Sequence, residues 1–519
     1  ALTDPTIYMS SITITRLLLS DNEYNCSSTS PPQVLTGRLL YFTNLAGVPE
    51  QFDQSIRILN SRITLHHDIV QGGFLIEMFN VVPLILMQNL TFFHDRSSSH
   101  DDTNELTIVS IGYSTMSLND VHFSKFSTQS PLIRLNKKAN VSMNATTFTN
   151  MTLSYSSSVI QTSEEDMISV NITYCSFSNF KFPDLSFPSA ITILRRSTNV
   201  YINNTNFTEL QGSWGTAIKA QLSDQFLEFY GTIVVENSLF SMNSVGAIKH
   251  DGGILLVNHC KFIHNTNKAN GGAISSQAPQ MIMLTNNHFE NNSVIFSGPS
   301  QTSFGGAVYI GLEDLDLEVW VSSNTFVSNS VIDRSGTLGR TSGGGGAIYI
   351  DLGAIPPADS ALYKAIHKLP TLNHFSNNSA IYGPDFATNA VFTAFQSYNS
   401  TDKSVSHECL TSPCQFHVQA WTDIFRDSHL NVYFLDLYGQ RLLPFYGEFL
   451  PSEYKMKLQI TNQPQPVYDF NCSSWNCIIN GNDVKIKGFA NQPLNLTFEV
   501  FHPSYPSINF TIMTSMREC

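Results

Sequence analysis

The chain has 519 residues, and its 28 lysine and arginine residues against 41 aspartate and glutamate residues give a formal net charge of −13. This balance excludes a typical nucleic-acid-binding protein, because that class needs a basic face to neutralise phosphates. Charged residues make up only 13% of the chain, whereas 36 phenylalanines and 19 tyrosines make it too rich in aromatic residues for a disordered protein.

Residues 1–84 contain three candidate strands, at residues 6–15, 33–42 and 55–65, without a regular repeat. We interpret this segment either as an N-terminal cap or irregular first coils, or as a leading strand that adds to the sheet edge of a neighbouring molecule. The chain begins at Ala1 without a basic and apolar leader, as a secreted chain does after processing. The apolar stretch at residues 81–87 is far shorter than the roughly 20 residues that cross a bilayer. We therefore expect a secreted or cell-surface protein without a membrane span.

Residues 85–390 repeat a pattern that is anchored on phenylalanine. Nine anchors follow one another along the chain: Phe92, Phe123, Phe148, Phe177, Phe207, Phe240, Phe262, Phe289 and Phe326. The residues seven and five positions before every anchor are apolar, and those four and three positions before it are mostly polar. Alternation followed by an interruption is typical of two short strands joined by a bend. The sequence therefore predicts an all-β chain with a right-handed parallel β-helix, in which the anchors stack inside coils about 4.8 Å apart.

Two further motifs recur in the later coils. A Phe-x-x-Asn motif begins at each of these residues: Phe240, Phe262, Phe289, Phe326 and Phe375. A Gly-Ala-Ile or Gly-Gly-Ala-Ile/Val motif lies between them, with its first glycine at these positions: Gly246, Gly271, Gly305 and Gly345. Stacked asparagine amides bond along the axis of such a fold, and glycine permits a positive φ at a tight corner. The Ala-Ile pair is predicted to begin a third strand.

These motifs resemble the repeats of the chlamydial polymorphic outer membrane proteins, and similar repeats occur in secreted surface proteins of protists and algae. The resemblance covers residues 85–390 and implies a parallel β-helix surface protein, which we expect to be of the secreted protist or algal type. Residues 379–388 are similar to the closing coil of that family, and Lys368 and Pro370 in the apolar columns before it indicate a capping coil. The longest insertions, after Phe289 and between Phe326 and Phe375, are expected to protrude from the shaft.

Residues 405–519 have a different pattern, in which short alternating runs are separated by turn residues. The candidate strands are residues 416–421, 431–436, 454–460, 483–487, 494–500 and 508–513. Such spacing predicts an Ig-like antiparallel β-sandwich of about 110 residues.

The eight cysteines fall into three groups. Cys409 and Cys414, and Cys472 and Cys477, form two Cys-x4-Cys pairs, and they are candidates for disulfides of undetermined connectivity in a secreted chain. Cys175 and Cys260 both lie two residues before an anchor, three coils apart, so they are predicted to be about 14 Å from each other as free buried thiols. Cys26 and Cys519 have either a local or missing partner or link successive molecules.

Asparagine sequons are predicted to carry N-linked glycans. Fourteen occur: Asn25, Asn89, Asn140, Asn144, Asn150, Asn171, Asn203, Asn206, Asn291, Asn377, Asn399, Asn471, Asn495 and Asn509. The nine within residues 85–390 avoid the columns that are predicted to face inward, so sugars attached there are expected to project into solvent.

A predicted β-helix also has to be considered as an enzyme, because many polysaccharide lyases and hydrolases have this fold. Two acidic clusters, at residues 164–166 and 313–318, have the pattern of an exposed loop and a solvated edge, and pectinase-type motifs are absent. His259, Cys260 and His264 are poorly arranged for zinc, since Cys260 is predicted to face inward and His259 to lie at the bend. We therefore expect no enzyme, no metal and no cofactor.

A structural role follows from these features. We expect an extracellular glycoprotein that is a subunit of a filament, coat or appendage and associates with itself through the chain ends and the sandwich. The alternatives are an adhesin that binds carbohydrate or protein through β-helix loops and a polysaccharide lyase or hydrolase.

Overall fold

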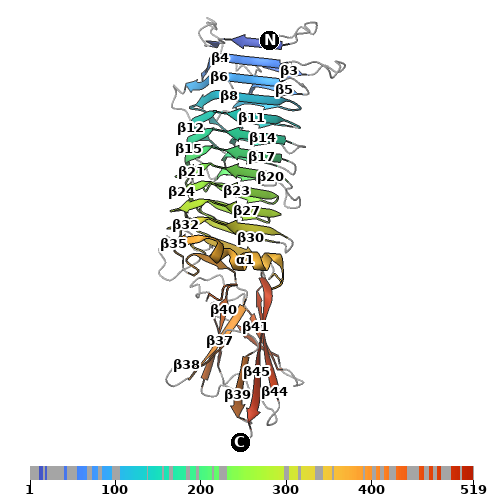
Figure 1. Ribbon diagram of the computed structural model, residues 1–519, viewed down its shortest axis with the longest axis vertical. Coiled ribbons are helices and arrows are strands. Elements are labelled where there is room, and N and C mark those ends of the chain that lie inside the picture. Colours follow the sequence, from blue (N-terminus) through green and yellow to red (C-terminus); the bar gives the residue numbers. More distant parts are fainter. Residues whose placement is uncertain are drawn as a thin grey trace, which may run out of the picture.

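The computed structural model describes residues 84–95 and 106–389, apart from residues 137, 155–156, 163–167, 183–187, 195–197, 213–215, 221–230, 297–302, 314–316, 334–342, 354–355 and 381. Outside these ranges it describes residues 428–440 and the backbone of the remaining strands given below. In Figure 1 the coils stack along the long axis from the N-terminus to helix α1 (Ala361–Leu372), and the C-terminal sheets extend beyond that helix.

The first sheet has 21 strands, and its named pairings between coils are parallel. Its strands are β1 (Ser11–Thr15), β2 (Leu18–Leu19), β4 (Ser55–His66), β6 (Leu84–Asp95), β8 (Thr115–Ser124), β9 (Ser127–Thr128), β11 (Asn140–Asn144), β12 (Thr147–Leu153), β14 (Ile168–Thr173), β15 (Ser176–Phe182), β17 (Thr198–Asn203), β18 (Asn206–Gly212), β20 (Thr232–Glu236), β21 (Leu239–Ser241), β23 (Ile254–Asn258), β24 (Lys261–Ile263), β27 (Met281–Thr285), β28 (His288–Glu290), β31 (Glu318–Ser322), β32 (Thr325–Val327) and β35 (His374–Ser376). Within the N-terminal segment, β1 pairs with β4 and β4 pairs with β6 in the same sheet.

The second and third sheets complete each coil. The second sheet holds β3 (Leu40–Thr43), β5 (Gly73–Phe79), β7 (Leu106–Ile111), β10 (Ile133–Leu135), β13 (Ser158–Thr162), β16 (Ser189–Ile193), β19 (Thr216–Ala220), β22 (Ile248–Asp251), β26 (Ile274–Gln277), β30 (Val308–Leu312), β34 (Ile348–Leu352) and β36 (Phe386–Thr388). The third sheet holds β25 (Thr266–Asn267), β29 (Ser293–Phe296) and β33 (Ser330–Asp333). Because each coil pairs in parallel with the next, the fold is a parallel β-helix.

The backbone bends within the first sheet at two fixed positions of each coil, where one residue adopts the left-handed conformation with a positive φ. The residue three positions before each of the nine anchors has a φ between 49° and 57°, and the one two positions after the anchors from Phe123 to Phe375 has a φ between 52° and 62°. Asparagine and aspartate tolerate this conformation best among residues with a Cβ, and Asn89, Asp120 and Asn286 are examples. The polar interruption in the sequence is therefore a backbone corner.

The core is a ladder of phenylalanine rings. All nine anchors are fully buried, and the centroids of neighbouring rings from Phe92 to Phe326 lie 4.7–4.9 Å apart, which is the spacing of the coils. Phe375 extends the ladder at 5.2 Å. The apolar residues seven and five positions before each anchor are also buried, since each is at most 5% exposed. The predicted inward columns are confirmed.

Asparagine side chains form two hydrogen-bonded ladders inside the later coils. In the Phe-x-x-Asn column, each Nδ2 donates to the Oδ1 of the next coil over 2.8–3.0 Å, from Asn243 to Asn378. The last amide, Asn378, donates to Asp385 Oδ1 at 3.0 Å. A second ladder joins Asn287, Asn324 and Asn373 two residues before the anchors. The stacked amides predicted from the motif are therefore present.

The glycine motif forms the corner that enters the second sheet. The first glycine has a positive φ in each copy, for example 71° at Gly305. The second glycine approaches the next coil so closely that a Cβ at Gly306 would lie 2.0 Å from the carbonyl oxygen of Gly346. No residue with a side chain fits there, and the strands that follow begin at the Ala-Ile or Ala-Val pair, as predicted.

Helix α1 replaces the strand that was expected before Phe375. Lys368 and Pro370 lie in this helix, so assigning them to the columns of a capping coil was wrong. Its apolar residues Leu362, Ile366 and Leu369 follow helical spacing and are buried. This part of the long insertion therefore packs on the last coil instead of protruding, and Ser360 caps its N-terminus by accepting a hydrogen bond from the Tyr363 amide.

The C-terminal residues form two sheets. One contains β37 (Phe392–Asn399), β38 (Val405–Cys409), β40 (Ser428–Leu435) and β43 (Asn476–Asn480), and the other contains β39 (Cys414–Gln419), β41 (Lys455–Ile460), β42 (Val467–Asn471), β44 (Pro493–His502) and β45 (Tyr505–Arg517). The four-stranded sheet is antiparallel, whereas β39 pairs in parallel with β45, which differs from the expected antiparallel arrangement. The expected strand at residues 483–487 lies outside the described residues, and the Ig-like sandwich stays a prediction.

Candidate functional site

The sequons of the β-helix lie on its outside. Seven of the nine asparagines are exposed, and Asn203 and Asn291 are half-buried. Asn89, Asn150, Asn291 and Asn377 are themselves left-handed corner residues, so their side chains leave the coil where the chain turns. Of the other five, Asn399, Asn471, Asn495 and Asn509 lie in strands of the C-terminal sheets, and Asn25 lies outside the described residues. Glycosylation at each site stays a prediction.

Cys175 and Cys260 are buried among the coils, and neither forms a disulfide. Burial raises the pKa of the Cys175 thiol to about 11 and that of the Cys260 thiol to about 12. Their Sγ atoms lie near backbone carbonyl oxygens, such as that of Thr173 for Cys175. Both side chains therefore occupy the column of small inward residues as protonated thiols.

The other cysteines remain predictions about disulfides. Cys409 ends β38, Cys414 begins β39 and Cys477 lies in β43, so the first pair spans the two C-terminal sheets. Cys472, Cys26 and Cys519 lie outside the described residues.

The residues weighed for catalysis or metal binding do not converge. Residues 164–166 and 314–316 lie outside the described residues, while Glu313 and Glu318 are exposed. His259 and His264 are left-handed corner residues on either side of the buried Cys260. Within the described ranges, no three His, Cys, Asp or Glu side chains are grouped so that they could hold a metal ion.

A charged cluster on the outer face of the second sheet was missed by the sequence reasoning. Lys219 and Lys249 are neighbours in register on β19 and β22, and Lys249 Nζ lies 3.7 Å from Asp251 Oδ2. Burial raises the pKa of Asp251, and burial together with Lys249 lowers the pKa of Lys219. In the next coils the Gln277 amide donates to Glu313 over 3.1 Å. Positive and negative groups compensate each other here, and aligning the residues after each Gly-Ala-Ile motif would have revealed the cluster.

The outward column of the first sheet starts with Leu86 in β6, is polar in the next three strands and is apolar in the five strands after those. Six residues before the anchors, the outward side chains are Ser117, Ser142 and Asn171 in β8, β11 and β14. In the next five strands the same column holds Tyr201, Val234, Leu256, Met283 and Trp320, which pair in register from strand to strand. Ile254 and Met281 lie beside them, two residues earlier in β23 and β27. We call these seven residues the apolar stripe; Trp320, the most exposed of them, is 57% exposed.

A buried carboxylate organises the joint between the β-helix and the C-terminal sheets. Asp436, directly after β40, is fully buried and accepts hydrogen bonds from the amides of Thr388, Tyr438 and Gln440. Burial outweighs these bonds and raises the pKa of Asp436 to about 6. The Leu437 amide donates to Thr388 Oγ1 at 2.9 Å, so the turn after β40 is tied to the last strand of the second sheet.

Helix α1 contributes to the same joint through a carbonyl group that its proline leaves free. Pro370 has no amide hydrogen, so the carbonyl oxygen of Ile366, four residues earlier, lacks its helical donor. The hydroxyl of Tyr438 donates to that oxygen at 3.0 Å. Gln440 Nε2 donates to the carbonyl of Phe386 at 2.9 Å. The helix, the closing coil and the turn are thereby held together.

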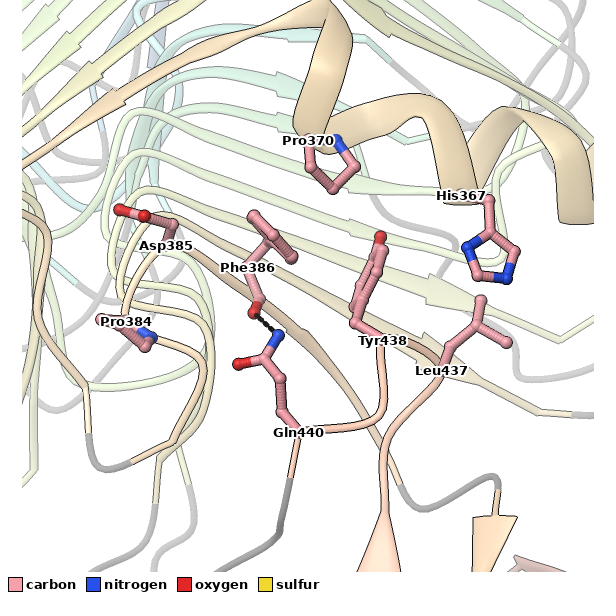
Figure 2. Close-up of a pocket in the computed structure, with 8 residues that line it drawn as sticks. All are labelled: His367, Pro370, Pro384, Asp385, Phe386, Leu437, Tyr438 and Gln440. Carbon is pink, nitrogen blue, oxygen red and sulfur yellow. Dashed lines mark hydrogen bonds between the residues drawn. The ribbon is translucent and has the colours of Figure 1, made fainter. Parts of the chain in front are cut away.

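These contacts surround a hollow of about 470 Å³ at the joint. Figure 2 shows His367 and Pro370 of α1 above it, residues 384–386 on one side, and Leu437, Tyr438 and Gln440 completing the lining. The lining is mostly apolar, and Asp385 supplies its one carboxylate. Glycoside hydrolysis generally uses two carboxylates, and the described lining holds one.

Comparisons with known proteins leave the family open. No family model matches the chain, and no curated protein matches it. Among solved structures, the crystal structure of the Dettilon tailspike protein matches with a TM-score of 0.30 and 12% sequence identity, covering 88% of this chain and 87% of that chain. A likeness this weak carries no argument, so the fold rests on the strand pairings themselves. No helix in the described part of the chain is long and apolar enough to cross a membrane.

Proposed function

We propose that this chain is an extracellular structural glycoprotein, a rigid rod from which a filament, coat or appendage is built. The single observation that supports it most is the continuous ladder of anchors from Phe92 to Phe375 beside the asparagine ladders. Twelve strands in the second sheet, stacked at about 4.8 Å, give roughly 55 Å of shaft. A shaft whose coils all share one spacing is stiff, which suits a building block.

The proposal includes secretion, N-linked glycans, disulfides in the C-terminal sheets and self-association. The outward position of the sequons supports glycosylation, because sugars at Asn140 or Asn171 would not disturb the core. The tied joint at Asp436 supports a fixed direction for the C-terminal sheets, which an assembling subunit needs.

Negative-stain imaging of the full chain, secreted from a glycosylating host, tests this function. We expect rods that form filaments or ordered arrays as the concentration rises. Dispersed monomers at every concentration and salt condition would contradict the structural role.

A second candidate is an adhesin that binds a saccharide in the hollow at the joint. Phe386, Tyr438 and His367 offer ring faces, and Asp385 offers an acceptor for sugar hydroxyls. A glycan array with the full chain should then identify a ligand, and His367→Ala should weaken its binding while His374→Ala, an exposed histidine outside the hollow, should not. No binding by the full chain would remove this candidate.

A further inference from the structure

We propose that the apolar stripe is a lateral contact between two copies of this chain. This inference rests on the proposed structural function and names the surface that serves it. The stripe runs over five neighbouring strands of one sheet face, and its side chains point away from the core while the residues between them, such as Leu255 and Ile282, are buried. No feature of the core requires apolar residues there.

The first sheet itself supplies an internal comparison. The outer face of β11 and β14 has polar side chains and carries the sequons Asn140, Asn144 and Asn171. In β20, β23, β27 and β31, which carry the stripe, there is no sequon, and Asn291, the one sequon between β20 and β31, lies at the corner after β28. The change from sugar sites to apolar side chains happens at β17, where Tyr201 begins the stripe and Asn203 is the last sequon of these strands. A face that must be approached closely by another molecule is thus free of potential glycans.

The charge of the chain limits where a second copy can approach. Two copies with a net charge of −13 each repel one another over most of their surface. None of the seven residues of the stripe is charged. Glu318, the first residue of β31, is an exposed acidic residue beside the stripe. Glu236, the last residue of β20, accepts a hydrogen bond from the Tyr201 hydroxyl at 2.9 Å. The stripe is therefore a region where a copy can approach with little repulsion.

The chemistry of the stripe favours protein over carbohydrate. Sugar sites combine an aromatic face with polar groups that bond hydroxyls, but Val234, Leu256 and Met283 have none to offer. Trp320 and Met283 are neighbours in register, and tryptophan and methionine are enriched at protein interfaces. The same stripe on a second copy offers a matching apolar surface.

The area sets the strength of the contact. Five strands at about 4.8 Å and about five residues at 3.3 Å cover roughly 400 Å² per copy. The two copies together bury about 800 Å², less than the 1,200–2,000 Å² of stable complexes. We therefore expect a dissociation constant of roughly 10 µM to 1 mM for an isolated pair, which many such contacts along aligned rods would reinforce.

Sedimentation equilibrium of the full glycosylated chain between about 1 and 500 µM tests the proposal, and wild type should associate over this range. Leu256→Glu adds a charge in the middle of the stripe and should weaken association about tenfold or more. Ser117→Glu places the same charge in the same outward column of β8, where Ser117 belongs to no sequon, and should leave association unchanged. Both residues face outward, so unchanged circular dichroism checks that each variant is folded.

A glycan introduced into the stripe is a second, independent way to prevent two copies from associating. Met283→Asn places an asparagine two residues before Thr285 and so creates a sequon in the middle of the stripe. The glycosylated variant should lose association, and removing its glycans enzymatically should restore part of it. Met283→Gln, which creates no sequon, separates the effect of the sugar from that of polarity.

The outcomes distinguish the two proposals. If wild type associates and Leu256→Glu and glycosylated Met283→Asn associate equally well, the stripe is not the contact, although the structural function stands. If wild type stays monomeric to 500 µM in solution while imaging shows filaments, the stripe is overturned and another surface builds them. Monomers in both experiments overturn both proposals.

Discussion

Replacing one asparagine of the inner ladder should destabilise the coils around it, and Asn329→Leu is the clearest case. Asn329 Oδ1 accepts hydrogen bonds from the backbone and side-chain nitrogens of Asn292, both at 3.0 Å. Its Nδ2 donates to the carbonyl of Phe289 and to Asn378 Oδ1, also at 3.0 Å. Leucine has a similar volume but makes none of these four bonds.

The magnitude follows from the bonds that are lost. At about 1 kcal/mol of net stability per buried hydrogen bond, four bonds are worth about 4 kcal/mol. The loss is concentrated in neighbouring coils, because each coil contacts only the next ones. Urea denaturation followed by circular dichroism gives the change in unfolding free energy, and hydrogen exchange at residues 289–333 shows whether the loss is local.

A matched substitution on the surface is the control. Asn119→Leu makes the same change at an outward position, where Asn119 Nδ2 donates a hydrogen bond to Ser117 Oγ at 3.1 Å. We expect it to change stability by about 0.5 kcal/mol or less. Equal destabilisation by the two variants would refute the reasoning that the ladder, and not asparagine as such, stabilises the coils.

Three further predictions test other parts of the molecule. Gly306→Ala should prevent folding and secretion, because its Cβ would lie 2.0 Å from the Gly346 carbonyl oxygen, whereas Gly439→Asn, at a turn where a Cβ meets no atom within 4 Å, should be tolerated. Cys175 and Cys260, with pKa values raised by burial to about 11 and about 12, should resist thiol reagents at pH 8 in the native protein and react after unfolding, as site-resolved mass spectrometry would reveal. Burial raises the pKa of Asp436 to about 6, well above the usual value of an aspartate, so the folded protein binds this proton more tightly than the unfolded one. Its contribution to stability should therefore fall by about 2 kcal/mol between pH 4 and pH 7, and a stability difference between wild type and Asp436→Asn that does not change with pH would contradict this.

The repeat could be predicted from the sequence because, in a parallel stack of coils, residues at equivalent positions lie next to one another and have similar side chains. Anchors such as Phe148 and Phe289 recur at constant offsets from their apolar partners even though the intervening loops differ in length. The amide ladder and the glycine corner followed for the same reason, since each depends on one backbone conformation repeated in every coil. The residues 361–372 were misread because the register of the strands was extended into them, although the spacing of Leu362, Ile366 and Leu369 already favoured a helix.

The sequence by itself determined which side chains line the interior of this protein, because alternation and a fixed offset from each phenylalanine specify the inner face of a coil. Only the tertiary structure decided which outward residues become neighbours. The stripe from Tyr201 to Trp320 joins strands that are 119 residues apart from end to end, and the joint brings Ile366, Thr388 and Asp436 together. Loops of uneven length separate these residues in the chain, so their contacts depend on how the coils stack and on how the last coil is closed.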